Sequence, residues 1–503
     1  MSKHGALLLR GSMLRTVLLI ANIAVGFFLM PFVIHAVGDR WYGMWVLVGT
    51  LIGYYGYFDF GLSVAVQRFI ARAIGQGDDA EVNRLVTTAF FLFLVLGVLA
   101  LIASAGAAVF APNFLNDPEE IRVFRIIVLI LGLNVAVSFA TAPVNGLFAG
   151  HMRFDVATIL QLVILIGRTI LIVYFMRAGY SIIALGTITF LAGLLENVAK
   201  IWYARRLFPA VRIRRSMYAP DRLGELFRYG GKTFLNQLAE LVRFQINQPV
   251  IAAFINLSAV TMFNIAGTLA YYFRSLIQAL SGVLVPMYAR QQAEGDRAGL
   301  AKSHIFTTKL TSVVAVLGGG AMIVFGDAFI RLWMGTQYAD AYPALVVLAV
   351  GTTVFMTQQP AVAMIYGLGV VGTLAKATIF EAVANVSLSL ILVQSHGILG
   401  VAFGTAIPLL FLSLYVMKFS ASLAGIGFLA YLRALVPLWT LLTAMQIGTG
   451  FVVSRVAPDS FSGLIMLFVA FYPVQALIAY LLTFTGEEQR LIRDTTARAV
   501  GIG

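Results

Sequence analysis

Four polar residues lie at helical spacing in an otherwise apolar segment near the middle of the chain. They are separated by four, three and four residues, which places them on one face of a helix: Asn236, Glu240, Arg243 and Asn247. An ionisable residue inside a membrane-spanning helix costs roughly 2.5–3.5 kcal/mol on insertion scales, and therefore marks a candidate functional site. Such a face cannot point toward lipid, so we expect it to face the interior of a helix bundle.

The next predicted helix adds a second arginine. Arg274 is followed one turn later by Gln278. Arginine suits phosphate, because its planar guanidinium donates paired hydrogen bonds and stays charged when it is partly desolvated. We predict a cavity that binds a phosphate-containing substrate and is lined by Arg243, Arg274, Asn236, Glu240, Asn247 and Gln278. The structural alternative is that Glu240 and Arg243 neutralise each other and only lock their helix into its bundle.

Four further ionisable residues fall within predicted helices and form a second set of candidates: Asp59, Arg168, Glu196 and Glu381. For Asp59, contact with the substrate and a structural bond to a neighbouring backbone or to Arg68 are both open. For the lone carboxylates Glu196 and Glu381, proton coupling and a satisfied packing role are both open.

Signatures of enzymes, metals and cofactors are weak in this sequence. The chain has no cysteine, and its five histidines lack the spacing of metal ligands. Residues 230–233 resemble the end of a phosphate loop, but Leu226 stands where the first glycine is needed. Residues 367–372 fit the GxGxxG pattern, yet they join two apolar helices and do not follow a strand. We expect neither an enzyme nor a bound cofactor or metal, and leave H⁺ and Na⁺ open as coupling ions.

Long apolar helices must position these residues. Of the 503 residues 60% are hydrophobic and only 11% are charged, against roughly 25% charged in a soluble domain. A helix needs about 20 apolar residues to cross roughly 30 Å of hydrocarbon. We predict an all-α integral membrane protein with about fourteen transmembrane helices, near residues 12–36, 41–67, 85–110, 122–149, 154–176, 180–203, 230–254, 258–288, 305–326, 342–366, 372–394, 398–418, 430–454 and 461–485.

The positive charges indicate the orientation of these helices. Lys and Arg collect in cytoplasmic loops, and an even number of helices puts both termini on one side. If that side is the cytoplasm, the opposite side holds only Arg40, Arg122, Arg125, Arg177, Arg331 and Arg455 of the 35 basic residues. Three more lie within spans: Arg168, Arg243 and Arg274. We interpret the basic run from Lys200 to Lys232 as a loop on an anionic leaflet, with a nucleic-acid site as the less favoured alternative.

An internal repeat appears when the chain is shifted by 218 residues. Residues 31, 49–51, 71–72 and 77–78 then meet identical residues at 249, 267–269, 289–290 and 295–296, and a shift of 217 pairs 143 with 360 and 150 with 367. This predicts two pseudo-symmetric six-helix lobes of equal orientation, related by an axis along the membrane normal. We expect lobes at 1–204 and 230–420, a basic inter-lobe loop at 205–229, and two extra helices with a tail at 421–503.

Several short motifs resemble the polysaccharide transporters of the multidrug/oligosaccharidyl-lipid/polysaccharide exporter superfamily. They are Trp41-Tyr42-Gly43, Asp59-Phe60-Gly61-Leu62, Arg68, Gly77-Asp78, Gly146 to Gly150, and Arg331-Leu332-Trp333-Met334-Gly335. The resemblance implies a flippase that moves an undecaprenyl-diphosphate-linked O-antigen or exopolysaccharide unit across the bacterial inner membrane by alternating access. It implies that Arg243 and Arg274 belong to a central cationic cavity. The first helix lacks the arginine cluster of the related lipid II flippases and offers Asn22 and His35, which argues against a peptidoglycan precursor.

The resemblance also suggests partners of the protein and two alternative functions. We expect the lipid-linked oligosaccharide and membrane lipids as ligands, a polysaccharide polymerase and other assembly proteins as partners, and no nucleic acid. A drug or cation exporter of the same superfamily is one alternative, but it would usually have twelve helices and an acidic cavity. A membrane polymerase or glycosyltransferase is another, although the sequence offers no long outer loop with catalytic residues.

Overall fold

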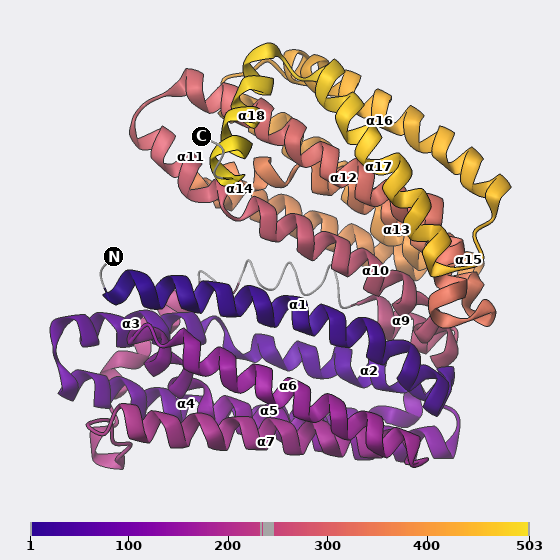
Figure 1. Ribbon diagram of the computed structural model, residues 1–503. Helices are drawn as coiled ribbons and strands as arrows, with labels where there is room; N and C mark the ends of the chain where they lie inside the picture. The colour runs from indigo at the N-terminus through magenta and orange to yellow at the C-terminus, as the bar shows by residue number, and fades with distance from the viewer. Residues whose placement is uncertain (1–2, 232–233, 235–245, 501–503) are drawn as a thin grey trace. The chain divides into compact units, whose positions relative to one another are not determined.

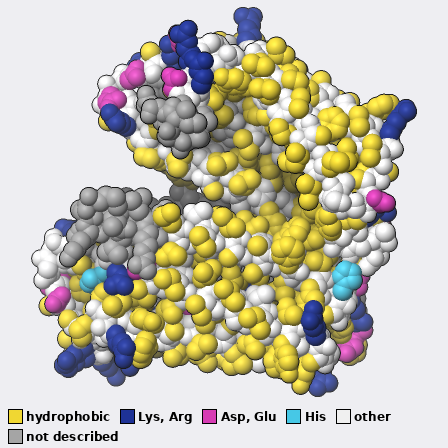
Figure 2. All heavy atoms as spheres, in the orientation of Figure 1, with side chains coloured by type: hydrophobic (Ala, Val, Ile, Leu, Met, Phe, Trp, Pro, Cys, Tyr) yellow, Lys and Arg dark blue, Asp and Glu magenta, His cyan; other side chains and the backbone are white. Residues whose placement is uncertain are grey.

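The described residues form helices joined by short turns. The computed structural model describes residues 3–231, 234 and 246–500, and within these ranges it contains no β-strand. Ten described helices are long and apolar enough to cross a membrane. On the face drawn in Figure 2, hydrophobic side chains dominate, and the visible Lys and Arg side chains gather toward the helix ends. The chain is therefore a multi-pass membrane protein, as its composition predicts.

The chain divides into two compact units, residues 1–261 and 262–503. The first contains, in order, α1 (Lys3–Val37), α2 (Asp39–Tyr55), η1 (Gly56–Asp59), α3 (Leu62–Gln76), α4 (Asp79–Phe110), η2 (Ala111–Asn113), α5 (Pro118–Gly150), α6 (Phe154–Arg177), α7 (Ile182–Leu207), η3 (Arg215–Met217), η4 (Pro220–Arg222) and α9 (Asn247–Phe254). Helix α5 packs against α3, α4 and α7, and α1 packs against α6 (Figure 1).

The second unit begins within α10 (Leu257–Ser281). It continues with α11 (Leu284–Ala293), α12 (Arg297–Met334), η5 (Thr336–Ala341), α13 (Tyr342–Thr357), α14 (Gln359–Gly367), α15 (Val371–Leu423), α16 (Phe428–Val456), α17 (Phe461–Thr483) and α18 (Gly486–Val500). Helix α12 is its centre and contacts α13, α14, α16 and α17.

Some helix boundaries differ from the predicted ones. The predicted helix at 41–67 is interrupted, because Phe60 and Gly61 adopt left-handed φ values of 50° and 73° between α2 and α3. The predicted helix at 342–366 is divided into α13 and α14 at Gln358. By contrast, the helices predicted at 372–394 and 398–418 correspond to the two parts of α15, which the non-helical residue Gly397 (φ 57°, ψ −133°) separates at the predicted break. The count of fourteen spans stays a prediction, since part of the seventh lies outside the described residues.

The structure repeats the same local features in both units. Gly77 and Gly295 have φ values of 71° and 70°. The next residue in each case caps a long helix: the Asp78 carboxylate accepts from the Glu81 N–H at 2.9 Å, and that of Asp296 accepts from the Gly299 N–H at 2.8 Å. An N-cap aspartate satisfies a free N–H at the start of a helix. The sequence repeat is therefore a structural repeat, in which α4 and α12 begin in the same way.

Two glycines make equivalent helix contacts in the two repeats. A Cβ atom on Gly150, the last residue of α5, would lie 3.3 Å from the Cα of Ala71 in α3. A Cβ atom on Gly367, the last residue of α14, would lie 2.8 Å from the Val285 carbonyl oxygen and 3.1 Å from the Ala289 nitrogen in α11. Ala71 and Ala289 are themselves related by the 218-residue shift. Both glycines thus allow two helix backbones to approach closely.

Gly367→Ala should destabilise the second unit by about 1–3 kcal/mol, because the new methyl group meets backbone atoms that cannot move aside easily. Gly372→Ala is the matched control, since a Cβ atom there would meet nothing within 4 Å. It should be neutral or stabilise by up to about 1 kcal/mol through helix propensity. Thermal unfolding of the two purified variants in detergent measures the difference. Equal melting temperatures would show that α11 and α14 do not meet at Gly367.

The basic segment between α7 and residue 223 is bound to the first unit. Asn83 of α4 donates to the Ala210 carbonyl oxygen at 3.1 Å and accepts from the Arg212 N–H at 2.5 Å. Thr88 accepts from the Ala219 N–H at 2.9 Å. The side chain of Arg222 pairs with that of Glu81, also of α4, at 2.9 Å. These contacts tie the segment to the start of α4, and it therefore belongs to the unit of residues 1–261.

Buried amides join the last two long helices. Gln446 of α16 donates to Gln475 of α17 at 2.9 Å, and Gln475 donates to the Thr449 hydroxyl at 2.6 Å. The hydroxyl of Tyr472 donates to Gln446 at 2.9 Å. Since lipid offers no hydrogen bonds to compete, such polar pairs hold membrane helices together. Helices α16 and α17 therefore form one pair beside α12.

Candidate functional site

A polar cavity of about 420 Å³ lies within the first unit, among α1, α5, α6 and α7. Its polar lining residues are Asn22, Asn134, Ser138, Asn145, Gln161, Arg168, Thr189, Glu196, Asn197 and Lys200. Leu18, Ile164, Leu165, Ala192 and Gly193 complete the wall. A polar surface this extensive inside a bundle of membrane helices is costly unless it serves a function. This cavity is our candidate substrate site.

Arg168 provides a positive charge in this cavity from α6. Its Nε atom is buried and has no hydrogen-bond partner in the described ranges. The side-chain oxygen of Asn134 in α5, which lines the same cavity, is also buried without a partner among these residues. A buried donor or acceptor without a partner costs about 1–3 kcal/mol. A ligand that supplies an acceptor to Arg168 and a donor to Asn134 would recover this free energy.

Glu196 and Lys200 form an ion pair on α7, also in the cavity wall. Their side chains meet at 2.7 Å, and the Lys200 side chain is only 8% exposed. Lys200 therefore belongs to a buried helical wall and not to the solvated basic run in which the sequence placed it, because α7 continues to Leu207. With Glu196 neutralising one cation, the charged lining of the cavity has an excess of one positive charge.

Amides and hydroxyls make up the rest of the polar lining. The hydroxyl of Thr141 donates to Asn197 at 2.6 Å, and Asn197 donates to Ser138 at 3.2 Å, which joins α5 to α7. Gly193 makes room for this wall, because a Cβ atom there would lie 2.2 Å from the Asn134 side-chain oxygen. Each amide both donates and accepts hydrogen bonds, as sugar hydroxyls do. The cavity can thus bind a hydroxyl-rich group beside an anionic one.

The sequence contained a signal for this cavity. Asn134, Ser138, Thr141 and Asn145 of α5 are spaced by four, three and four residues. This is the same spacing that marks residues 236–247 as a polar helix face, but it includes no charged residue. A polar face on an apolar helix is therefore informative even when all its members are neutral.

The first set of predicted site residues is only partly described. Asn236, Glu240 and Arg243 lie outside the described residues. Asn247 is buried at the start of α9. Arg274 is half-buried in α10, with its guanidinium carbon 5.7 Å from the centre of the Tyr271 ring. Gln278, one turn later, is exposed. The role of this set stays a prediction.

The second set is distributed over three places. Arg168 and Glu196 meet in the polar cavity. The two carboxylate oxygens of Asp59 accept from the backbone N–H groups of Gly61 and Ser63 at 2.6 and 3.3 Å, which stabilises the start of α3. Glu381 is buried in α15, in the wall of an apolar groove of about 620 Å³ between the two parts of that helix.

Comparison with known proteins identifies the family. A family model described as "Polysaccharide biosynthesis protein" matches residues 60–343. The uncharacterized membrane protein EpsK of Bacillus subtilis is 22% identical over 483 residues, which cover 94% of each chain. The succinoglycan biosynthesis transport protein ExoT of Rhizobium meliloti is 21% identical over 316 residues, 61% of this chain and 62% of that protein.

Solved structures show the fold. The lipid II flippase MurJ in an inward closed conformation superimposes with a TM-score of 0.72 at 14% identity, over 92% of this chain and 99% of that one. An inward-facing multidrug resistance MATE family transporter of the MOP superfamily gives a TM-score of 0.67 at 18% identity, over 81% and 94%. These matches confirm the predicted multidrug/oligosaccharidyl-lipid/polysaccharide exporter fold. Because the family model covers more than half of its residues, the chain belongs to the polysaccharide biosynthesis protein family of membrane proteins.

Proposed function

We propose that this protein is a flippase for undecaprenyl-diphosphate-linked oligosaccharide units of an O-antigen or exopolysaccharide. It would act in a bacterial inner membrane, with both termini in the cytoplasm, by alternating access and without enzymatic chemistry. The observation that carries the proposal is the polar cavity of the first unit, with its amide lining and a buried Arg168 Nε atom that has no hydrogen-bond partner among the described residues. Family membership and the succinoglycan transport protein among its relatives support the same substrate class.

The chemistry of the substrate explains why such a cavity is needed. A sugar headgroup with a diphosphate cannot cross about 30 Å of hydrocarbon unaided, because losing its water without replacement costs far more than thermal energy. Amide and hydroxyl groups replace the water around the sugars, and guanidinium groups replace it around the diphosphate. The lipid tail meanwhile stays in the bilayer.

The charge of the cavity separates this proposal from export of cationic drugs. A site for a cationic drug needs negative charge in excess, whereas Arg168 and Lys200 outnumber Glu196 in this lining. An excess positive charge repels a cation and attracts a diphosphate. The likeness to multidrug transporters therefore concerns the fold and not the ligand.

The test is translocation of lipid-linked oligosaccharide in membrane vesicles of defined orientation, with and without the protein. The wild type should move the headgroup to the opposite leaflet, where an added glycosidase can reach it. Arg274→Ala should reduce the rate by roughly 10- to 100-fold if Arg274 makes a charge-assisted hydrogen bond worth about 1.5–3 kcal/mol. The control is Arg290→Ala, whose side chain is 80% exposed in the short helix α11.

Two outcomes distinguish a failure of the proposed function from a failure of the prediction for Arg274. Translocation that is equal with and without the protein would refute the flippase. Translocation that needs the protein but is unchanged in Arg274→Ala would instead refute the prediction that Arg274 binds the substrate.

A further inference from the structure

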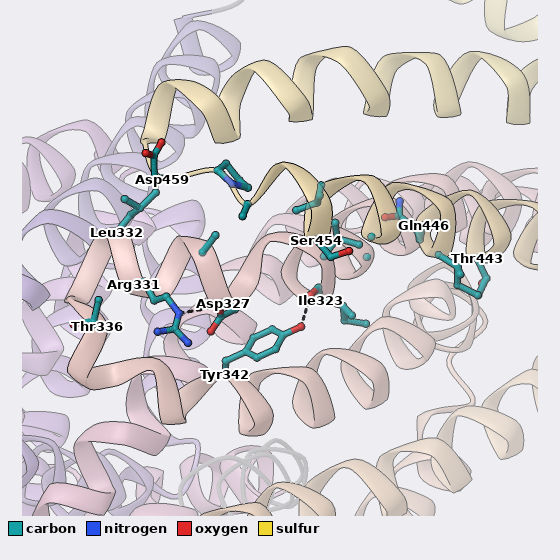
Figure 3. A pocket seen from close by; sticks show the side chains of 18 residues that line it. Ile323, Asp327, Arg331, Leu332, Thr336, Tyr342, Thr443, Gln446, Ser454 and Asp459 are labelled. Carbon is teal, nitrogen blue, oxygen red and sulfur yellow. Dashed lines mark hydrogen bonds and ion pairs between the residues drawn. The ribbon is translucent and has the colours of Figure 1, made fainter.

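A groove of about 900 Å³ runs between α12 and α16 in the second unit, and its lining shares no residue with the candidate substrate site. Every third or fourth residue of α12 from Gly320 to Leu332 lines one wall, and residues of α16 from Thr443 to Ser454 line the other. Thr336, Tyr342 and residues 457–459 surround one end (Figure 3). Most of the lining side chains between the ends are apolar.

The two ends of the groove differ in chemistry. Figure 3 shows Asp327, Arg331 and Thr336 close together toward the end near the helix termini, with Asp459 apart from them in the loop before α17, and Thr443 and Gln446 at the other end. Arg331 donates to Asp327 at 2.8 Å, and both side chains are partly exposed, at 46% and 43%. At the inner end, both the nitrogen and the oxygen of the Gln446 amide are engaged by Gln475 and Tyr472. The groove is therefore charged at its mouth and apolar along its floor.

The length of the groove matches one leaflet of a bilayer. The eleven steps along α12 from Gly320 to Arg331 rise about 16 Å, and half of a hydrocarbon core is about 15 Å. Its charged mouth lies at the helix ends, where headgroups are found, and its floor reaches the middle of the helices. An acyl chain with a polar head fits this polarity, whereas a soluble ligand would leave the apolar floor unused.

The charges at the mouth select among headgroups. The lining there contains two carboxylates, Asp327 and Asp459, and one guanidinium, Arg331, which is paired with Asp327, so the lining carries one excess negative charge. An anionic lipid or a diphosphate is disfavoured there, while a headgroup with both signs can place its phosphate at Arg331 and its amine at the carboxylates. A primary ammonium donates three hydrogen bonds, as lysine does, and a trimethylammonium donates none. The mouth therefore favours ethanolamine over choline.

We propose that the groove between α12 and α16 binds one zwitterionic phospholipid with a primary ammonium group, phosphatidylethanolamine. The bound lipid would lie along the groove that α12 and α16 line, beside the direct contacts between these two helices. It would stabilise the α16–α17 pair against α12 by adding packing contacts along the groove. This site is independent of the proposed transport substrate, since it takes a lipid of the bilayer itself.

A substitution at Gly450 tests directly whether the lipid binds in this groove. A Cβ atom on Gly450 would lie 3.6 Å from a methyl group of Val324 across the groove, which is ordinary contact, so a leucine there should extend into the lipid's place. Gly448, on the same helix, does not line the groove, and a Cβ atom there would meet nothing within 4 Å. Gly450→Leu and Gly448→Leu thus make the same chemical change on two faces of α16.

The experiment is native mass spectrometry of the delipidated protein after addition of phosphatidylethanolamine, phosphatidylcholine or phosphatidylglycerol of identical chains. The wild type and Gly448→Leu should retain one phosphatidylethanolamine, with roughly tenfold lower retention of the other two lipids. Gly450→Leu should lose this bound lipid. Asp459→Asn, a change in an exposed loop, should keep the fold and reduce the preference for ethanolamine over choline.

Four results would overturn the proposal. Equal retention of all three lipids would remove the selectivity, and preferred phosphatidylglycerol would contradict the charge argument. Retention of the lipid by Gly450→Leu would place it elsewhere. Because Asp459→Asn tests the headgroup site without altering the packing of the helices, an unchanged lipid preference in that variant counts against the site even if Gly450→Leu fails to fold.

Discussion

Glu488→Gln should cost the protein about 3–5 kcal/mol of stability, because it removes the negative partner of a buried lysine. The ammonium group of Lys309 in α12 lies 2.9 and 3.2 Å from the two carboxylate oxygens of Glu488 and 3.1 Å from the Thr483 carbonyl oxygen. The two charged side chains are only 7% and 16% exposed. Glutamine keeps the shape of glutamate but leaves the charge of Lys309 uncompensated.

Glu487→Gln provides the control for this change. Glu487 is the preceding residue of α18, and it pairs with Lys302 at 3.7 Å between side chains that are 88% and 80% exposed. Exposed pairs contribute little, so this variant should stay within about 1 kcal/mol of the wild type. Thermal unfolding and protease access to the C-terminal helix, measured on both variants in the same detergent, compare the two pairs. If the two variants unfold alike, Lys309 does not depend on Glu488 for its neutralisation.

Arg168→Gln should slow the translocation of lipid-linked oligosaccharide by roughly 10- to 100-fold. The reason is that a hydrogen bond to a charged group is worth about 1.5–3 kcal/mol, and each 1.4 kcal/mol changes a rate or an affinity tenfold. Arg168 is the one cation of this cavity that has no ion pair with a described carboxylate, since Lys200 is paired with Glu196. Glutamine retains a donor but removes the charge that would meet the diphosphate.

Arg177→Gln is the control variant for Arg168→Gln, since it makes the same substitution in the same helix. Arg177 is the last residue of the same helix α6, is exposed, and does not line the cavity. It should leave translocation unchanged at equal protein level. Thermal unfolding with added pyrophosphate separates a role of Arg168 in binding from a role in packing. Pyrophosphate should protect the wild type from unfolding, and Arg168→Gln should lose that protection. Normal translocation by Arg168→Gln would exclude this cavity as the diphosphate site.

The membrane helices and the repeat could be predicted because their causes are local. A run of about 20 apolar residues must become a helix in lipid, whatever surrounds it, since every backbone polar group has to be satisfied within the segment. Gly77-Asp78 and Gly295-Asp296 produce the same turn and cap in both units for an equally local reason: a left-handed φ that favours glycine and a short carboxylate that reaches the N–H three residues on.

Composition and periodicity thus established the helical class, the duplication and the presence of intramembrane polar residues, because each of these depends on residues close together in the chain. Composition and periodicity did not predict which helix faces contact each other. Lys200 is a buried partner of Glu196, and Lys309 pairs with Glu488 at a separation of 179 residues. The neutral polar face of α5 lines a cavity only because α1, α6 and α7 close around it. Tertiary packing decides which polar faces become neighbours, since many arrangements of apolar helices bury a similar area and differ mainly in these few polar contacts.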